Sequence, residues 1–113
     1  MTQQNCIFCQ IIAGDLKSTI VWQDDKILAI NDMSPQAPCH LLIIPKQHYT
    51  DITECKDSLL LGNMLNQASQ LMRKEGISSG FRVVINTGSH GGQTVPHIHI
   101  HVLGGRPMVW PPG

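Results

Sequence analysis

Residues 97–103 of the chain read His97-Ile98-His99-Ile100-His101-Val102-Leu103, so that histidines alternate with apolar residues. In a β-strand, successive side chains point to opposite faces, which places the three histidines together and the apolar side chains together. Neighbouring imidazoles on the shared face would project roughly 6.6 Å apart. We therefore expect the apolar face to pack on the core and the histidines to line a cleft. An amphipathic strand with three exposed histidines is the alternative.

The crowding of the histidines favours a chemical role. Half of the six histidines in the chain fall within residues 97–101. Cationic imidazoles this close would repel one another, which favours their neutral forms near pH 7. A neutral imidazole is both a nucleophile and a metal ligand.

A glycine-rich loop, residues 87–96, stands directly before the histidines and follows Asn86. Its glycines allow backbone N–H groups to approach a ligand closely, and Asn86 and Thr94 would add polar side chains. The loop lacks the Gly-Lys-Ser/Thr ending of a P-loop. Taken alone, this segment is typical of a flexible hairpin loop; beside the histidines, it predicts a phosphate cradle.

Further out, the pattern of apolar residues predicts five strands, over 20–22, 27–30, 39–45, 81–86 and 97–103. A short helix is expected over 6–12. A long helix should begin after the N-cap Asp57 and end near Lys74, before Gly76. Its apolar stripe would consist of Leu61, Met64, Leu65, Ala68, Leu71 and Met72. The fold class is therefore α+β, with a five-stranded antiparallel sheet, one long helix and one short helix.

The bulk properties fit one domain over residues 1–113, with a loose N-terminus over 1–5 and a C-terminal tail over 104–113. Hydrophobic residues make up 42% of the chain, and the formal net charge is zero. A neutral chain has no general attraction to nucleic acid or to an anionic membrane. No segment resembles a membrane span or a signal peptide, so we expect a cytoplasmic protein.

Four cysteines are present, and two of them form the motif Cys6-x-x-Cys9. Without a secretion signal they are expected to stay reduced or to bind metal. A redox motif normally follows a strand, and no strand is predicted before Cys6. A closed zinc site would need two further ligands. Packing of a short helix by two small side chains is the alternative.

Taken together, these motifs resemble the histidine-triad family, whose signature alternates three histidines with apolar residues. The resemblance to the branch of histidine-triad nucleotide-binding proteins covers nearly the whole chain. It extends over residues 32–40, Ile44-Pro45-Lys46, residues 86–94 and Trp110-Pro111-Pro112-Gly113. It implies a homodimer, with the sheet extended across the two copies, that hydrolyses purine nucleoside phosphoramidates. AMP, GMP and their phosphoramidates are the nucleotides expected to bind.

The resemblance also implies roles for individual residues. His99 would attack the α-phosphorus and form a nucleotidyl-histidine, from which water releases AMP. His101 would lie against the phosphate and leaving group, His97 is the first member of the triad, and His40 would fix the tautomers of the rings. Asp32 would accept from the ribose hydroxyls; without the resemblance it reads as a solvated turn residue. The expected substrate-binding set is Asp32, Met33, Asn86, Gly92, Gln93, Thr94, Val95, Ile7, Phe8, Ile11, Ile30, Leu42 and Trp110.

Two further expectations concern metals. Some bacterial family members resemble this chain in carrying a structural zinc site, which here would consist of Cys6, Cys9, His48 and His97. No cofactor is expected to be needed for the chemistry itself. Two other functions stay open: a metal-dependent phosphohydrolase that uses His97, His99 and His101 as ligands, and a nucleotide-binding adaptor with incidental catalysis.

Overall fold

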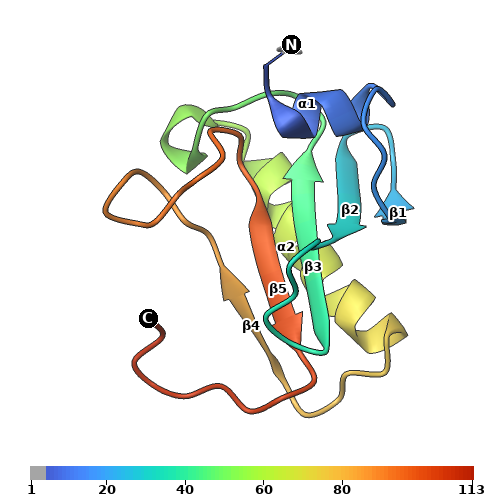
Figure 1. The fold of residues 1–113 in the computed structure, drawn as a ribbon, viewed down its shortest axis with the longest axis vertical. Coiled ribbons are helices and arrows are strands. Elements are labelled where there is room, and N and C mark those ends of the chain that lie inside the picture. The colour runs from blue at the N-terminus through green and yellow to red at the C-terminus, as the bar shows by residue number, and fades with distance from the viewer. Residues whose placement is uncertain (1–4) are drawn as a thin grey trace.

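The computed structural model describes residues 5–113, so that most of the expected loose N-terminus lies outside the described residues. The sheet contains five antiparallel strands in the order β1-β2-β3-β5-β4 (Figure 1). This confirms the predicted α+β class. The elements are α1 (Ile7–Ile12), β1 (Ile20–Gln23), β2 (Ile27–Asn31), β3 (Cys39–Pro45), the 3₁₀ turn η1 (Ile52–Glu54), α2 (Ser58–Lys74), β4 (Phe81–Val84) and β5 (Ile100–Gly104).

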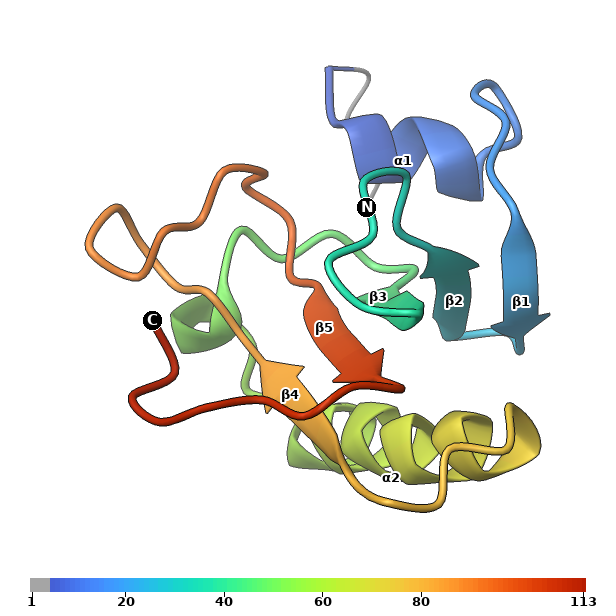
Figure 2. The ribbon, with the colours of Figure 1, turned by 60° about the horizontal axis from the view of Figure 1, so that its bottom comes forward.

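The two helices lie on opposite faces of the sheet (Figure 2). Alternate residues of the central strands therefore enter different apolar clusters, as in β3, where Leu41 and Ile43 pack with α2 and Leu42 and Ile44 pack with α1. In the last strand region, Ile98, Ile100 and Val102 belong to the α2 cluster. The histidines between them are consequently directed to the α1 face, as the alternation predicts.

The last strand is shorter than predicted, because β5 begins at Ile100 and not at His97. Its ladder with β3 runs from Cys39↔Gly104 to Ile43↔Ile100. The next partners would approach Pro45, which has no N–H to donate, and the backbone N–H of Ile98 donates instead to the carbonyl of Tyr49 at 2.9 Å. Pairing therefore ends, while the alternation of side chains continues back to His97.

Other predicted boundaries differ by one or two residues: α1 begins at Ile7, β1 ends at Gln23 and β2 ends at Asn31. β4 ends at Val84, so Asn86 lies in the loop and its amide donates to the Gly91 carbonyl at 2.6 Å. β5 includes Gly104, so the tail begins one residue later than expected.

The long helix α2 begins where predicted, because the Asp57 carboxylate accepts the N–H of Leu60 at 3.0 Å. Arg73 and Lys74 occupy its last turn. The prediction was wrong for Leu65, which is exposed, and incomplete for Leu60, which is buried. The buried stripe is Leu60, Met64, Ala68, Leu71 and Met72. At 3.6 residues per turn, Leu65 stands about 140° around the helix from Leu60 and about 20° beyond Met72, at the edge of this stripe.

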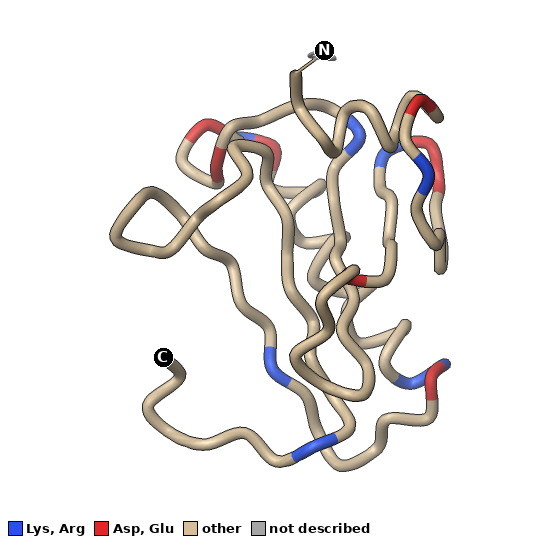
Figure 3. The backbone as a smooth tube through the Cα atoms, viewed as in Figure 1, with Lys and Arg blue, Asp and Glu red and all other residues tan. Residues whose placement is uncertain are grey.

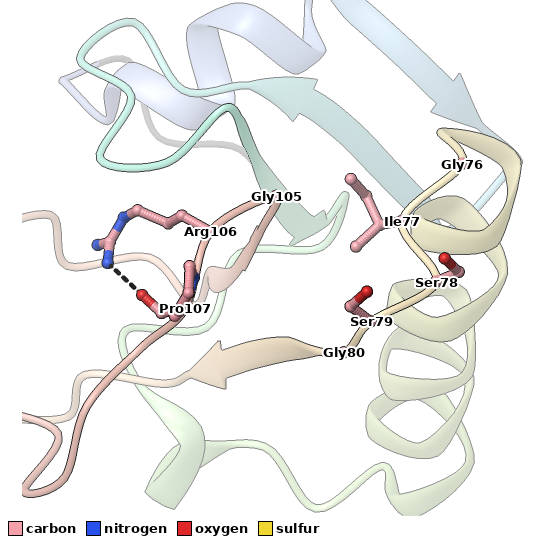
Figure 4. Close-up of a pocket in the computed structure, with 8 residues that line it drawn as sticks. All are labelled: Gly76, Ile77, Ser78, Ser79, Gly80, Gly105, Arg106 and Pro107. Atoms are coloured by element: carbon pink, nitrogen blue, oxygen red, sulfur yellow. Dashed lines mark hydrogen bonds between the residues drawn. The ribbon is translucent and has the colours of Figure 1, made fainter.

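Acidic and basic residues are spread around the turns and the periphery (Figure 3). A hollow of about 460 Å³ lies between the α2–β4 connection and the start of the tail, and it includes Ser78, Ser79 and Arg106 (Figure 4). The Arg106 guanidinium there donates to the carbonyls of Gln36 and Pro107, which ties the tail to the loop before β3. No helix within residues 5–113 combines the length and apolar character needed to cross a membrane.

Candidate active site and metal cluster

Five histidines are in ring contact along the α1 face. The rings of His48 and His97 have centroids 4.7 Å apart, those of His99 and His101 5.1 Å, and those of His101 and His40 5.2 Å. Phe8 of α1 presents edge-to-face contacts to His97 and His99 at 5.8 Å and 5.0 Å. The structure thus brings together all four histidines that were predicted to be catalytic.

His99 is held in one tautomer by the backbone. Its Nδ1 lies 2.8 Å from the carbonyl oxygen of His97, and a carbonyl can only accept, so Nδ1 carries the proton. In the neutral ring, Nε2 then holds the free lone pair. The side chain is 6% exposed, which leaves this nitrogen little competition from bulk water. In this tautomer Nε2 is the nitrogen that can act as a nucleophile or as a metal ligand.

His101 and His40 form a hydrogen-bonded pair. The backbone N–H of Gln36 donates to His40 Nδ1 at 3.0 Å, so the proton of neutral His40 is on Nε2. This nitrogen lies 2.9 Å from His101 Nδ1, which must accept and leaves the His101 proton on Nε2. Burial lowers the pKa of both rings, and the neighbouring His99 and His40 lower that of His101 further. Both rings are therefore neutral near pH 7 in the free protein.

His97 turns its ring away from this pair. Its Nε2 donates to the carbonyl of Pro45 at 2.9 Å, so the lone pair is on Nδ1. That nitrogen faces Cys6 Sγ at 3.2 Å, His48 Nδ1 at 3.0 Å and Cys9 Sγ at 3.6 Å. The side chain is fully buried, and this burial chiefly lowers the pKa of His97, to about 4. His97 is thus a neutral imidazole whose Nδ1 lone pair points at two sulfurs and a second imidazole.

These four donors fit a tetrahedral zinc ion. Zinc bonds of about 2.0–2.3 Å to nitrogen and sulfur would separate the ligand atoms by roughly 3.3–3.8 Å. The ligand atoms of Cys6, Cys9, His48 and His97 all lie within 4.8 Å of one another. Cys6 also caps α1, because its Sγ accepts the N–H of Cys9. A metal held here would join α1 to the segment that leads into β5.

The glycine-rich loop is held from within by its own side chains. Gln93 donates to the carbonyls of Thr50 and Val95 and accepts the N–H of Gly88. A Cβ at Gly91 would overlap the Thr87 carbonyl, and Gly92 has φ of +77°. Of the residues expected to touch phosphate, Gln93 and Asn86 therefore serve to shape the loop, Thr94 is exposed, and Val95 packs against the α1 cluster.

Only some of the apolar residues expected around the base lie together in the structure. Phe8, Ile11, Ile30 and Leu42 are buried in the α1 cluster, which makes them core residues of this face. Ile7 is exposed on the outer side of α1. Met33 and Trp110 are 89% and 84% exposed in the single chain and pack on neither cluster. Asp32 is half-buried, with Oδ2 3.4 Å from His40 Nε2.

Comparison with known proteins places this fold. Residues 13–108 match the model of the HIT domain. The chain belongs to the HIT-domain family. An uncharacterised HIT-like protein of Synechococcus elongatus is 46% identical to this HIT domain over 112 residues, which is 97% of this chain and 98% of that protein.

Two plant relatives carry descriptive names. The protein named Adenylylsulfatase HINT1 of Arabidopsis thaliana is 45% identical and covers 95% of this chain and 76% of its own length. The 14 kDa zinc-binding protein of Brassica juncea is also 45% identical, over 95% of this chain and 98% of that protein.

Solved structures agree with the family. A HIT family hydrolase from Legionella pneumophila superposes with a TM-score of 0.93 at 53% identity, over 96% of this HIT domain and 100% of that chain. A zinc-bound histidine triad family protein from Mycobacterium smegmatis gives a TM-score of 0.82 at 32% identity, over 90% and 76% of the two chains.

Four contributors to the site of this HIT domain were missed at the level of sequence. The carbonyls of Pro45 and His97 and the N–H of Gln36 act through the backbone, so their side chains give no signal. Gly91 was seen only as part of a glycine-rich run. The run Gly91-Gly92 signals a tight turn, but the clash that requires Gly91 becomes visible only in three dimensions.

Proposed function

We propose that this HIT domain hydrolyses the P–N bond of purine nucleoside 5'-phosphoramidates through a nucleotidyl-His99 intermediate. The observation that carries the proposal is the contact between His99 Nδ1 and the His97 carbonyl, since it leaves Nε2 free to attack. The similarity to HIT family hydrolases supports a hydrolytic reaction. The neighbouring rings of His99, His101 and His40 support a reaction at phosphorus, because a neutral imidazole can act there as the nucleophile.

The reaction is a double displacement. The lone pair of His99 Nε2 forms a bond to the α-phosphorus, and the P–N bond breaks with its electron pair going to the amine nitrogen. The amine takes a proton and leaves. Water then attacks the same phosphorus, loses a proton and displaces His99 Nε2 with its electron pair, which gives AMP. His101 Nε2–H is directed away from His40 and is the group we assign to the leaving nitrogen.

Binding of the nucleotide would use both ends of the histidine face. We propose that the loop 87–96 holds the phosphate, with Thr94 and the backbone N–H of Val95 as donors. Phe8 and Leu42 would meet the base, and the Asp32 carboxylate would accept from the ribose hydroxyls. Trp110, exposed in the single chain, would be contributed by the tail to a second copy.

The zinc cluster is proposed as a structural element. Cys6, Cys9, His48 and His97 would hold the ion, which would supply a cross-link and no chemistry. The zinc-binding name of the Brassica juncea relative and the zinc-bound Mycobacterium smegmatis structure support this assignment. The three-histidine metal hydrolase is disfavoured, because within residues 5–113 the clusters that converge are Cys6-Cys9-His48-His97 and Asp32-His40-His101.

Mass spectrometry of protein quenched during turnover tests the proposal. Incubation with an adenosine 5'-phosphoramidate should give a mass increase of one adenylyl group, mapped to the peptide that contains His99. The His99→Ala variant should show no adduct and no turnover. An adduct on another residue, or full turnover by the variant, would refute the covalent role of His99. Binding of AMP without any turnover by the wild-type protein would favour the adaptor function.

A further inference from the structure

Asp32 stands beside the histidine pair and not only beside the expected ribose position. Its Oδ2 lies 3.4 Å from His40 Nε2 and 4.0 Å from His101 Nδ1. The other oxygen, Oδ1, accepts the N–H of Ser34 at 2.8 Å. One oxygen is therefore anchored in the loop after β2, and this fixes the direction of the other toward the two rings.

An extra proton on the His40–His101 pair would place two N–H groups face to face. Because Gln36 donates to His40 Nδ1, the His40 proton is on Nε2 and points at His101 Nδ1, 2.9 Å away. If His101 gains a proton, its Nδ1–H would face this Nε2–H. Two donors that face each other at this distance repel, so the charged pair needs an acceptor next to both. Asp32 Oδ2 lies beside both nitrogens, 3.4 Å from His40 Nε2 and 4.0 Å from His101 Nδ1, so its negative charge would offset this repulsion.

We propose that Asp32 is a positioning residue that lets the His40–His101 pair carry the proton taken by the leaving amine. This inference rests on the proposed function. The pair first gains one proton from solvent at His101 Nδ1. When the P–N bond breaks, the amine nitrogen takes the proton of His101 Nε2, the N–H electron pair stays on Nε2, and the pair becomes neutral. In the second step the attacking water returns a proton to the same nitrogen, so the pair regains its starting charge.

The surrounding charges agree with this role. His101 faces His99 in the segment just before β5, His40 on β3 and Asp32 in the loop after β2. Burial, His99 and His40 lower the pKa of His101, whereas Asp32 raises it. Burial also lowers the pKa of His40, and Asp32 again opposes this. Asp32 is thus the one acidic group among these neighbours that favours a protonated pair.

Leaving-group dependence separates this role from simple ribose recognition. The Asp32→Asn variant keeps the size and Oδ1 of the side chain and removes the charge. With an alkylamine phosphoramidate, whose nitrogen must be protonated to leave, we expect kcat to fall roughly tenfold or more. With an arylamine of low basicity, kcat should change little. The matched control is Asp25→Asn, an exposed residue in the turn between β1 and β2, which should behave as wild type.

The pH profile gives a second readout. If the protonated pair supplies the leaving-group proton, kcat for the alkylamine falls as pH rises through the pKa of the pair. Since Asp32 raises that pKa, Asp32→Asn should move this limb to lower pH. An equal loss of kcat with both amines and an unmoved limb, with KM alone raised, would overturn the inference and leave Asp32 as a ribose ligand.

A measurement without substrate keeps the two proposals distinguishable. NMR titration of the histidine rings should show lower pKa values for His40 and His101 in Asp32→Asn than in wild type, and no change in Asp25→Asn. Unchanged titrations would overturn the inference even if the enzyme is active. Wild-type protein that cleaves neither amine would refute the proposed function, and the titrations would then decide the placement of Asp32 by themselves.

Discussion

Removal of zinc should destabilise the protein by an amount set by the length of chain that the cluster closes. Cys6 and His97 are 91 residues apart in sequence, and Cys9 and His48 are 39 apart. In the chain-entropy treatment, a cross-link that closes about 90 residues disfavours the unfolded state by roughly 4.6 kcal/mol. For a domain of this size that corresponds to a fall of roughly 15–20 °C in Tm.

Differential scanning calorimetry with and without a chelator measures this effect, with zinc content determined on the same sample. The Cys9→Ser variant should lose bound zinc and melt near the chelated wild type, with no further response to the chelator. Cys39→Ser is the matched control, because Cys39 lies on β3 outside the cluster and should keep both the metal and the response.

Two results would refute the reasoning. Freshly prepared protein with a zinc content near zero would remove the metal from the cluster altogether. Stoichiometric zinc whose removal shifts Tm by less than about 3 °C would show that the cluster does not cross-link the native chain in the way that the loop lengths require.

Three other predictions concern the site and its surroundings. His99→Ala should abolish turnover while the affinity for AMP, measured by calorimetry, stays within a few-fold of wild type; lost AMP binding would indicate a damaged pocket. Gly91→Ala should lower kcat/KM by about 10- to 100-fold, because its methyl group would displace the loop, whereas Gly62→Ala in α2 meets open space and should leave kinetics unchanged. The free edge of β4, with exposed Phe81 and Val83, should pair two copies; light scattering should then give twice the chain mass, and a monomeric wild-type protein would contradict this.

Most of the fold could be predicted because it follows from short-range patterns. The period-two alternation of Ile98, Ile100 and Val102 determined which face His99 and His101 occupy. The Asp57 N-cap was visible from its position before the helical stripe. The boundary of β5 was not predictable by alternation, since it depends on Pro45 of a different strand. Leu65 was misplaced because it falls at the edge of the apolar stripe, where helical spacing alone does not determine how far the sheet covers the helix.

The sequence predicted which histidines and cysteines come together in the candidate site, but not their tautomers or their distances. Histidines and cysteines are rare and reactive, so their clustering in sequence carried over to clustering in space. The tautomers of His97 and His99 could not be predicted, because carbonyl groups of the backbone determine them. The same limit applies to Asp32: the family resemblance implied a ribose ligand, but its distance to His40 depends on how the loop after β2 folds back.

His97 is connected to both halves of this centre, with its ring in the cysteine cluster and its carbonyl on His99. Grafting the three imidazoles of His97, His99 and His101 onto another scaffold would therefore not reproduce the proposed nucleophile. The new scaffold would also need a carbonyl on the neighbouring strand, in the place of Pro45, to orient the His97 ring. The His97 peptide group would have to be held in place as well, because its carbonyl orients the His99 ring. A transfer of this site would therefore have to include the backbone around His97 and its partner strand, and not only the side chains.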